Sequence, residues 1–160
     1  LIEGDYMNRK GFTLIELLAV IVILAILVMI AIPAVTRYLD TARKGTFADA
    51  AQSAISAVRM DYVSKSYVGN YTYTKKDIDE LLEKKLITSP FGKSYSGDSA
   101  VTVTQGTDGA TTYSICLADG YRILNQKEKD AISDKVEVYS DTNKCPKATS
   151  SFEASSEGTK

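Results

Sequence analysis

Residues Gly11 to Val35 read GFTLIELLAVIVILAILVMIAIPAV, and this stretch decides how the chain folds. From Leu17 to Ile32 it holds sixteen apolar residues without interruption. Taken from Leu14 to Val35, the segment is long enough to cross the ~30 Å hydrocarbon layer of a membrane as a helix. We therefore expect a membrane-spanning helix near this end of the chain.

Glu16 is the one charged residue between Gly11 and Val35. A carboxylate inside a hydrocarbon layer costs at least ~2.5–3.5 kcal/mol by insertion scales, so such a residue is a candidate functional group with a charged partner. The alternative is a glutamate near the membrane surface that reaches water or takes up a proton.

Helical periodicity continues beyond this segment. From Thr36 onward, apolar residues recur at three- and four-residue steps, so that they share one face of a helix. These residues are Phe47, Ala50, Ala51, Ala54, Ile55, Val58 and Tyr62. A helix from Phe12 to about Tyr67 would be roughly 80 Å long at ~1.5 Å per residue, more than one small domain can bury. Half of it is therefore expected in a membrane or among neighbouring copies of the chain.

Pro33 lies inside this helical pattern. Because proline lacks a backbone N–H and its ring crowds the preceding turn, we expect it to kink or loosen the helix. The alternative is a proline that only marks the point where the helix leaves the membrane.

The rest of the chain alternates between helix, turn and strand patterns. Gly69-Asn70 ends the long helix, and Lys75–Ile87 predicts a short helix with Thr74 as its N-cap. From Ala100 the apolar period changes to two, with glycine-containing turns between the segments. Strands are predicted from Ala100 to Thr104 and over Thr111–Leu117, Tyr121–Leu124 and Val136–Tyr139, while Gln126–Ser133 is either a short helix or a polar loop. Three or four strands then form an antiparallel sheet that covers the amphipathic face of the long helix.

Two further segments stand out by composition. Four tyrosines cluster where the long helix ends, and we expect them to pack against the sheet rather than to form a ligand cage: Tyr62, Tyr67, Tyr71 and Tyr73. Lys147 to Lys160 is polar and rich in serine, which is typical of a flexible tail.

The composition excludes several classes of function. The net charge of the 160-residue chain is −1, which does not suggest a polybasic nucleic-acid-binding protein. The chain has no histidine, the commonest general base and metal ligand, and its two cysteines cannot close a structural zinc site without histidine. For Cys116 and Cys145, an extracellular disulfide is favoured over two buried free thiols.

The segment Gly11-Phe12-Thr13-Leu14-Ile15-Glu16 ahead of the apolar run resembles the type IV pilin family, which includes the pseudopilins of secretion and DNA-uptake machines. The resemblance is specific over Gly11–Val35 and only architectural beyond Tyr62. It implies a prepilin with a class III signal, whose leader over residues 1–11 a prepilin peptidase removes by cleaving between Gly11 and Phe12. The same enzyme methylates the new α-amino group of Phe12, and Glu16 pairs with that amine on a neighbouring subunit during assembly.

This resemblance implies an α+β fold in which a long N-terminal helix, half membrane-spanning and half amphipathic, packs on a small antiparallel β-sheet. The expected parts are a cleaved leader (1–11, with Met7 as a candidate translation start), a transmembrane and filament-core helix (12–35), a globular pilin domain (36–146) and a flexible polar tail (147–160). Many pilins carry a disulfide near the C-terminus, and the placement of Cys116 and Cys145 is similar.

The predicted function is that of a structural subunit and not of an enzyme: the pilin of a type IV pilus. Such a subunit is stored in the bacterial cell membrane with its N-terminus inside and then assembled into an extracellular filament for adhesion, surface motility or biofilm formation. The expected partners are further copies of the chain in a helical homopolymer, prepilin peptidase, a membrane assembly platform, a cytoplasmic ATPase motor and, before assembly, the lipid bilayer. No cofactor, metal or specific nucleic acid is expected.

Two alternatives remain open at this point. The first is a minor pilin or a pseudopilin of a type II secretion or competence machine, which shares the same anchor. Major pseudopilins typically carry an acidic calcium loop near the C-terminus, and the spacing of Asp141, Thr142 and Asn143 fits one poorly, which favours a true pilin. The second alternative is a membrane-anchored extracellular enzyme or receptor domain.

Overall fold

The computed structural model describes residues 11–83, 88–147 and 152–153 of the chain. Contacts divide the chain into two compact units, Leu1–Leu39 and Asp40–Lys160. The helix α1 (Leu14–Ser64) begins in the first unit and ends in the second. All strands and the short helix α2 (Lys75–Leu81) belong to the second unit.

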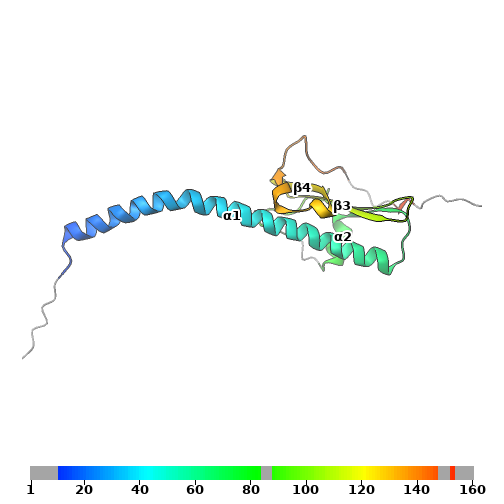
Figure 1. The fold of residues 1–160 in the computed structure, drawn as a ribbon, viewed down its shortest axis with the longest axis horizontal. Helices are drawn as coiled ribbons and strands as arrows, with labels where there is room; N and C mark the ends of the chain where they lie inside the picture. The colour runs from blue at the N-terminus through cyan, green and yellow to red at the C-terminus, as the bar shows by residue number, and fades with distance from the viewer. Residues whose placement is uncertain (1–10, 84–87, 148–151, 154–160) are drawn as a thin grey trace, which may run out of the picture. The chain divides into compact units, whose positions relative to one another are not determined.

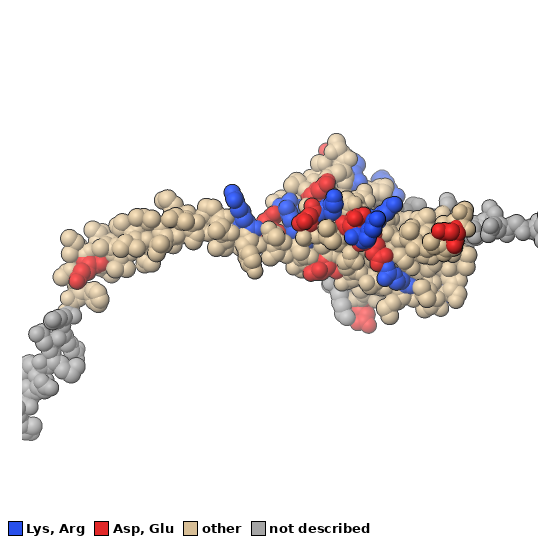
Figure 2. All heavy atoms as spheres, viewed as in Figure 1, with Lys and Arg blue, Asp and Glu red and all other residues tan. Residues whose placement is uncertain are grey.

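The first unit is an apolar helix whose side chains have no cover within the described residues. Every large apolar side chain from Phe12 to Val35 has an exposed fraction between 50% and 89%. The helix continues through Pro33, and the Thr36 hydroxyl donates a hydrogen bond of 3.1 Å to the Pro33 carbonyl. By its length and composition this helix is able to cross a membrane. Figure 2 shows hardly any charged atoms over this segment, whereas charged atoms gather on the second unit.

The second unit is built on one antiparallel sheet with the strand order β5-β4-β3-β2-β1-β6. Its central strands are β1 (Asn70–Thr74), β2 (Ala100–Gln105), β3 (Thr111–Ala118) and β4 (Arg122–Lys127), and its short edge strands are β5 (Glu137–Val138) and β6 (Phe152–Glu153). Val103 lies opposite Tyr71 on one side and Tyr113 on the other, and Leu117 lies opposite Leu124. Figure 1 shows the C-terminal part of α1 along the sheet, with α2 beside it.

The main core lies between this part of α1 and one face of the sheet. The helix contributes the face that its periodicity predicts, and fully or nearly fully buried residues on it are Phe47, Ala51, Ala54, Ile55, Val58 and Tyr62. The facing strands contribute Val101, Val103, Tyr113, Ile115, Leu117 and Leu124. The core residues of β2 and β3 stand at every second position, which is the period of two by which a strand places side chains on one face.

Polar contacts also hold α1 to β4 and to the 3-10 turn that follows it. The Gln52 side-chain amide donates hydrogen bonds of 2.9 and 3.1 Å to the carbonyls of Glu128 and Ala131. Arg59 forms an ion pair with the carboxylate of Glu128. Close to the start of the unit, Arg122 of β4 forms an ion pair of 2.8 Å with Asp40.

A smaller cluster covers the opposite face of the sheet. Cys116 of β3 and Cys145 form a disulfide with a Cα–Cα distance of 5.6 Å. Ala118 and Ile123 are buried beside it, and Tyr139 packs against this cluster. The disulfide therefore ties the segment after β5 across the face of the sheet that α1 does not cover.

The structure confirms that the four tyrosines pack in the main core: Tyr62 and Tyr73 are buried, and Tyr67 and Tyr71 pack against them. It also shows a strand that the sequence analysis did not predict, because Tyr71 and Tyr73 belong to β1, with ring centroids 4.6 Å apart. The strand starts directly after Gly69, whose φ of 105° lies in the left-handed region that favours glycine. The turn is held by the Tyr62 hydroxyl, which donates a hydrogen bond of 2.7 Å to the Gly69 carbonyl.

Other predictions differ from the structure at the ends of elements. The long helix spans Leu14–Ser64 rather than Phe12 to Tyr67, and α2 ends at Leu81 rather than Ile87, with residues 84–87 outside the described part. Thr74 is confirmed as the N-cap of α2. The segment Gln126–Ser133 splits between the end of β4 and a 3-10 turn over Glu128–Asp130, and Val136–Tyr139 shortens to β5.

Candidate assembly site at the N-terminal end of α1

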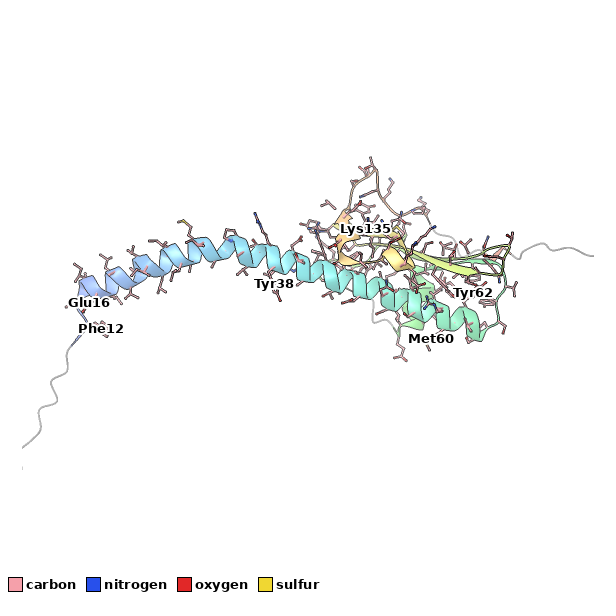
Figure 3. All side chains as sticks on the ribbon, viewed as in Figure 1. Phe12, Glu16, Tyr38, Met60, Tyr62 and Lys135 are labelled. Carbon is pink, nitrogen blue, oxygen red and sulfur yellow. A yellow bond between two sulfur atoms is a disulfide. The ribbon has the colours of Figure 1, made fainter. Side chains whose placement is uncertain are left out.

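The start of α1 brings together Phe12, Thr13 and Glu16. Phe12 has an exposed fraction of 89%, and Thr13 is the residue directly before the helix. The Glu16 atom Oε2 accepts a hydrogen bond of 2.8 Å from the Thr13 backbone N–H and one of 2.9 Å from the Thr13 hydroxyl. In return the Glu16 backbone N–H donates to Thr13 Oγ1 at 3.3 Å. Figure 3 shows Phe12 and Glu16 close together at this end of the helix.

This arrangement is a capping box. It satisfies backbone donors at the first turn of the helix that otherwise have no partner, and a negative charge there also lies favourably in the field of the helix dipole. Both bonds from Thr13 end on the same carboxylate oxygen. Within the described residues, Glu16 Oε1 has no partner, although a carboxylate can accept about four hydrogen bonds. The capping box therefore fixes the carboxylate and leaves one oxygen open.

The sequence analysis named Glu16 but missed its bond to Thr13. The signal was present, because a threonine followed three residues later by a glutamate and an apolar run is the sequence signature of this cap. Thr13 thus joins the candidate site as the residue that orients Glu16.

The remaining predicted site residues lie elsewhere in the chain. Gly11 is adjacent to Phe12, and a side chain placed on it would meet no atom within 4 Å. Pro33 lies in the same unit far along α1, while Cys116 and Cys145 lie in the second unit. Among the residues that the structure describes, no group of three or more histidine, cysteine, aspartate and glutamate side chains is placed to hold a metal ion.

Comparison with known sequences agrees with this geometry. Residues 6–32 match the prokaryotic N-terminal methylation motif, which covers Phe12, Thr13, Glu16 and most of the apolar segment. This motif, together with the relative described below, supports a type IV pilin-like protein. The apolar helix and the motif together support a membrane-anchored, pilin-like protein.

One similar protein is the ComG operon protein 3 homolog of Bacillus licheniformis, which is 40% identical over 63 residues. The matched stretch covers 38% of this chain and 65% of the relative. The likeness thus spans somewhat less than two thirds of the relative's length. No solved structure matches the chain.

Proposed function

We propose that the chain is the subunit of a type IV pilus-like filament, stored in the cell membrane and then assembled outside it. In this proposal prepilin peptidase cleaves between Gly11 and Phe12 on the cytoplasmic side and methylates the Phe12 amine. The leader over residues 1–11 is lost, and the domain that follows the apolar helix forms the filament surface. The observation that carries the proposal is the fixed Glu16 carboxylate next to the cleavage position, in an otherwise apolar helix.

The geometry of Glu16 supports a contact between subunits. Oε2 is held by Thr13, so that Oε1 accepts the ammonium group of Phe12 from a neighbouring copy without breaking the cap. A charge left alone among packed apolar helices is costly, and a partner cation removes most of that cost. The pairing therefore selects the correct register of two copies more than it adds net stability.

Assembly also requires an energy source. A helix that moves from lipid into a bundle of apolar helices exchanges one apolar environment for another, so little hydrophobic free energy is gained. In this proposal a membrane assembly platform and a cytoplasmic ATPase motor drive the extraction of the subunit. Adhesion, surface motility and biofilm formation are the roles that such a filament serves.

The likeness to the ComG operon protein 3 homolog supports a second candidate. In that case the chain is a pseudopilin of a competence machine, with the same processing and the same packing of α1, in a filament that serves DNA uptake. A minor pilin or a pseudopilin of a secretion machine likewise shares the processing and the packing of α1 with the main proposal. It differs only in the role of the filament that it joins. Two measurements separate these roles. One is a count, on whole cells, of filaments that contain the chain, and the other is the transformation frequency after deletion of its gene.

The test of the proposal is a pair of substitutions at Glu16. Glu16→Gln keeps the cap, because glutamine also serves at this position of a capping box, but it removes the charge. We expect Glu16→Gln to insert into the membrane and to be cleaved as the native chain is, yet to yield at least about tenfold fewer filaments, since each 1.4 kcal/mol lost at a contact is tenfold. Glu16→Leu removes both the cap and the charge and is expected to show the same loss of filaments.

Mass spectrometry of the membrane protein reports cleavage and methylation, and electron microscopy with an antibody to the chain reports filaments. Gly11→Arg supplies the uncleaved reference, because a peptidase pocket built for glycine does not admit a long cation. Filaments at native yield from Glu16→Gln would show that the charge of Glu16 has no role in assembly.

A further inference from the structure

The charged residues of α1 divide into those with a partner and those without. Asp40 pairs with Arg122 and Lys44, Arg59 pairs with Glu128, and Asp61 pairs with Lys65 and accepts a hydrogen bond from Tyr73. Arg37 also has a partner. Glu16 is held by Thr13.

Arg43 and Asp49 are different. Both side chains are exposed, and within the described part of the chain neither has a hydrogen bond or an ion pair. One is a cation and the other an anion, and both lie in the half of α1 that belongs to the second unit. The two charges are complementary, but one chain cannot join them, because of where they lie on the helix.

Six residues separate Arg43 from Asp49, which at about 100° per residue turns the helix by about 240°. The two side chains therefore point in different directions, about 120° apart around α1. A contact that joins two different patches of a subunit is a head-to-tail contact, and such contacts repeat into rings or helical filaments. The geometry thus suits a pair formed between two copies.

Asp49 also lies at one end of a groove on the outer face of α1. The groove has a volume of about 850 Å³ and runs past Ser53, Ser56 and Met60, with Leu81 and Leu82 of α2 and the turn after it along its side. The exposed fraction of Met60 is 74%, and Figure 3 shows this residue on the outer side of the helix. Small side chains beside one exposed apolar residue let another helix approach closely.

We propose that α1 of a second copy of this chain lies along this groove, with its Arg43 paired to Asp49. The inference rests on the proposed function, since anchoring in one membrane is what brings the copies together in parallel. The pair requires one copy to be shifted outward by six residues, ~9 Å at ~1.5 Å per residue.

The test is charge reversal in the full-length chain in cells that assemble it. Arg43→Asp and Asp49→Arg each place like charges at every such contact, and each is expected to lower the yield of sheared filaments at least about tenfold while the amount and cleavage of the membrane protein stay unchanged. The double variant Arg43→Asp/Asp49→Arg restores opposite charges and is expected to return most of the yield. Production of the two single variants in one cell is expected to restore it too, because the two chains can then alternate.

A matched control reverses two exposed charges outside α1 that have no partner within the described residues, Lys93→Asp together with Asp98→Lys. This control is expected to assemble normally. Any one of three results would overturn the inference. These are a native filament yield from both single reversals, failure of both rescues, and an equal loss of filaments in the control. The absence of filaments from the unaltered chain in its own host would instead overturn the proposed function, so the two failures are distinguishable.

Discussion

The substitution Phe47→Ala tests how α1 is held on the sheet. The Phe47 side chain is completely buried, and its ring lies 5.5 Å from that of Tyr95 and 6.3 Å from that of Phe91, measured between centroids. Truncation of a buried phenylalanine to alanine removes its transfer free energy and leaves a cavity, which together cost about 3–5 kcal/mol. A small domain has about 5–15 kcal/mol of stability in total, so the loss is a large fraction of it.

The assay is urea unfolding of a soluble version of the chain that begins at Arg37. This version is expected to fold alone, because the buried residues of the main core lie between Phe47 and Val136. With a slope of about 1–3 kcal/mol per molar urea, the midpoint is expected to fall by at least about 1 M at an unchanged slope. Met60→Ala is the control, since the exposed fraction of Met60 is 74% and its truncation is expected to change stability by no more than about 0.5 kcal/mol. A loss below about 1 kcal/mol for Phe47→Ala would refute the packing of α1 described above.

Two further predictions concern the same domain. Replacing Cys116 and Cys145 together by alanine opens a loop whose ends are 29 residues apart and is expected to cost about 3–4 kcal/mol in urea unfolding; equal midpoints with and without reductant in the unaltered domain would contradict this. Burial, followed by the nearby charge of Asp119, raises the pKa of the Tyr95 hydroxyl from 10.0 to about 12. The unfolded chain therefore loses this proton first as the pH rises above 10, and stability that is fully present below pH 10 is expected to fall by up to about 2–3 kcal/mol by pH 12. The fall is expected to be smaller in Tyr95→Phe, and an equal fall in both proteins would assign it to other groups.

Sequence periodicity predicted the parts of the fold that depend on local pattern. The buried face of α1 and the strands β2 and β3 follow from apolar residues at steps of three to four and of two. The strand β1 was missed because its five residues stand between a helix end and a helix start, too short a run for alternation to decide. Its pairing with β2 is what defines it. The two-residue strand β5 likewise exists only through its pairing with β4.

The candidate site divides in the same way. Gly11, Phe12 and Glu16 were recognisable from their order ahead of an apolar run, and the cap by Thr13 was readable from its spacing. The sequence could not show that Arg43 and Asp49 lack partners within the described residues, because this is known only once the partners of the other charged residues on α1 are known. Those partners include Arg122 and Glu128, which lie far away in the sequence and near only in the folded chain.

The exposed apolar half of α1 explains why a few polar residues matter so much. Nearly identical apolar side chains from Leu17 to Ile32 pack about equally well at many registers, so they supply contact area but little preference for one alignment. A charge that lacks its partner is penalised in every wrong register, which makes specificity a matter of a small number of pairs. In the two proposals made above, Glu16 supplies this selection in the first unit, and Arg43 with Asp49 supplies it in the second unit. A small number of such pairs is therefore enough to select one alignment for a helix whose apolar side chains select none.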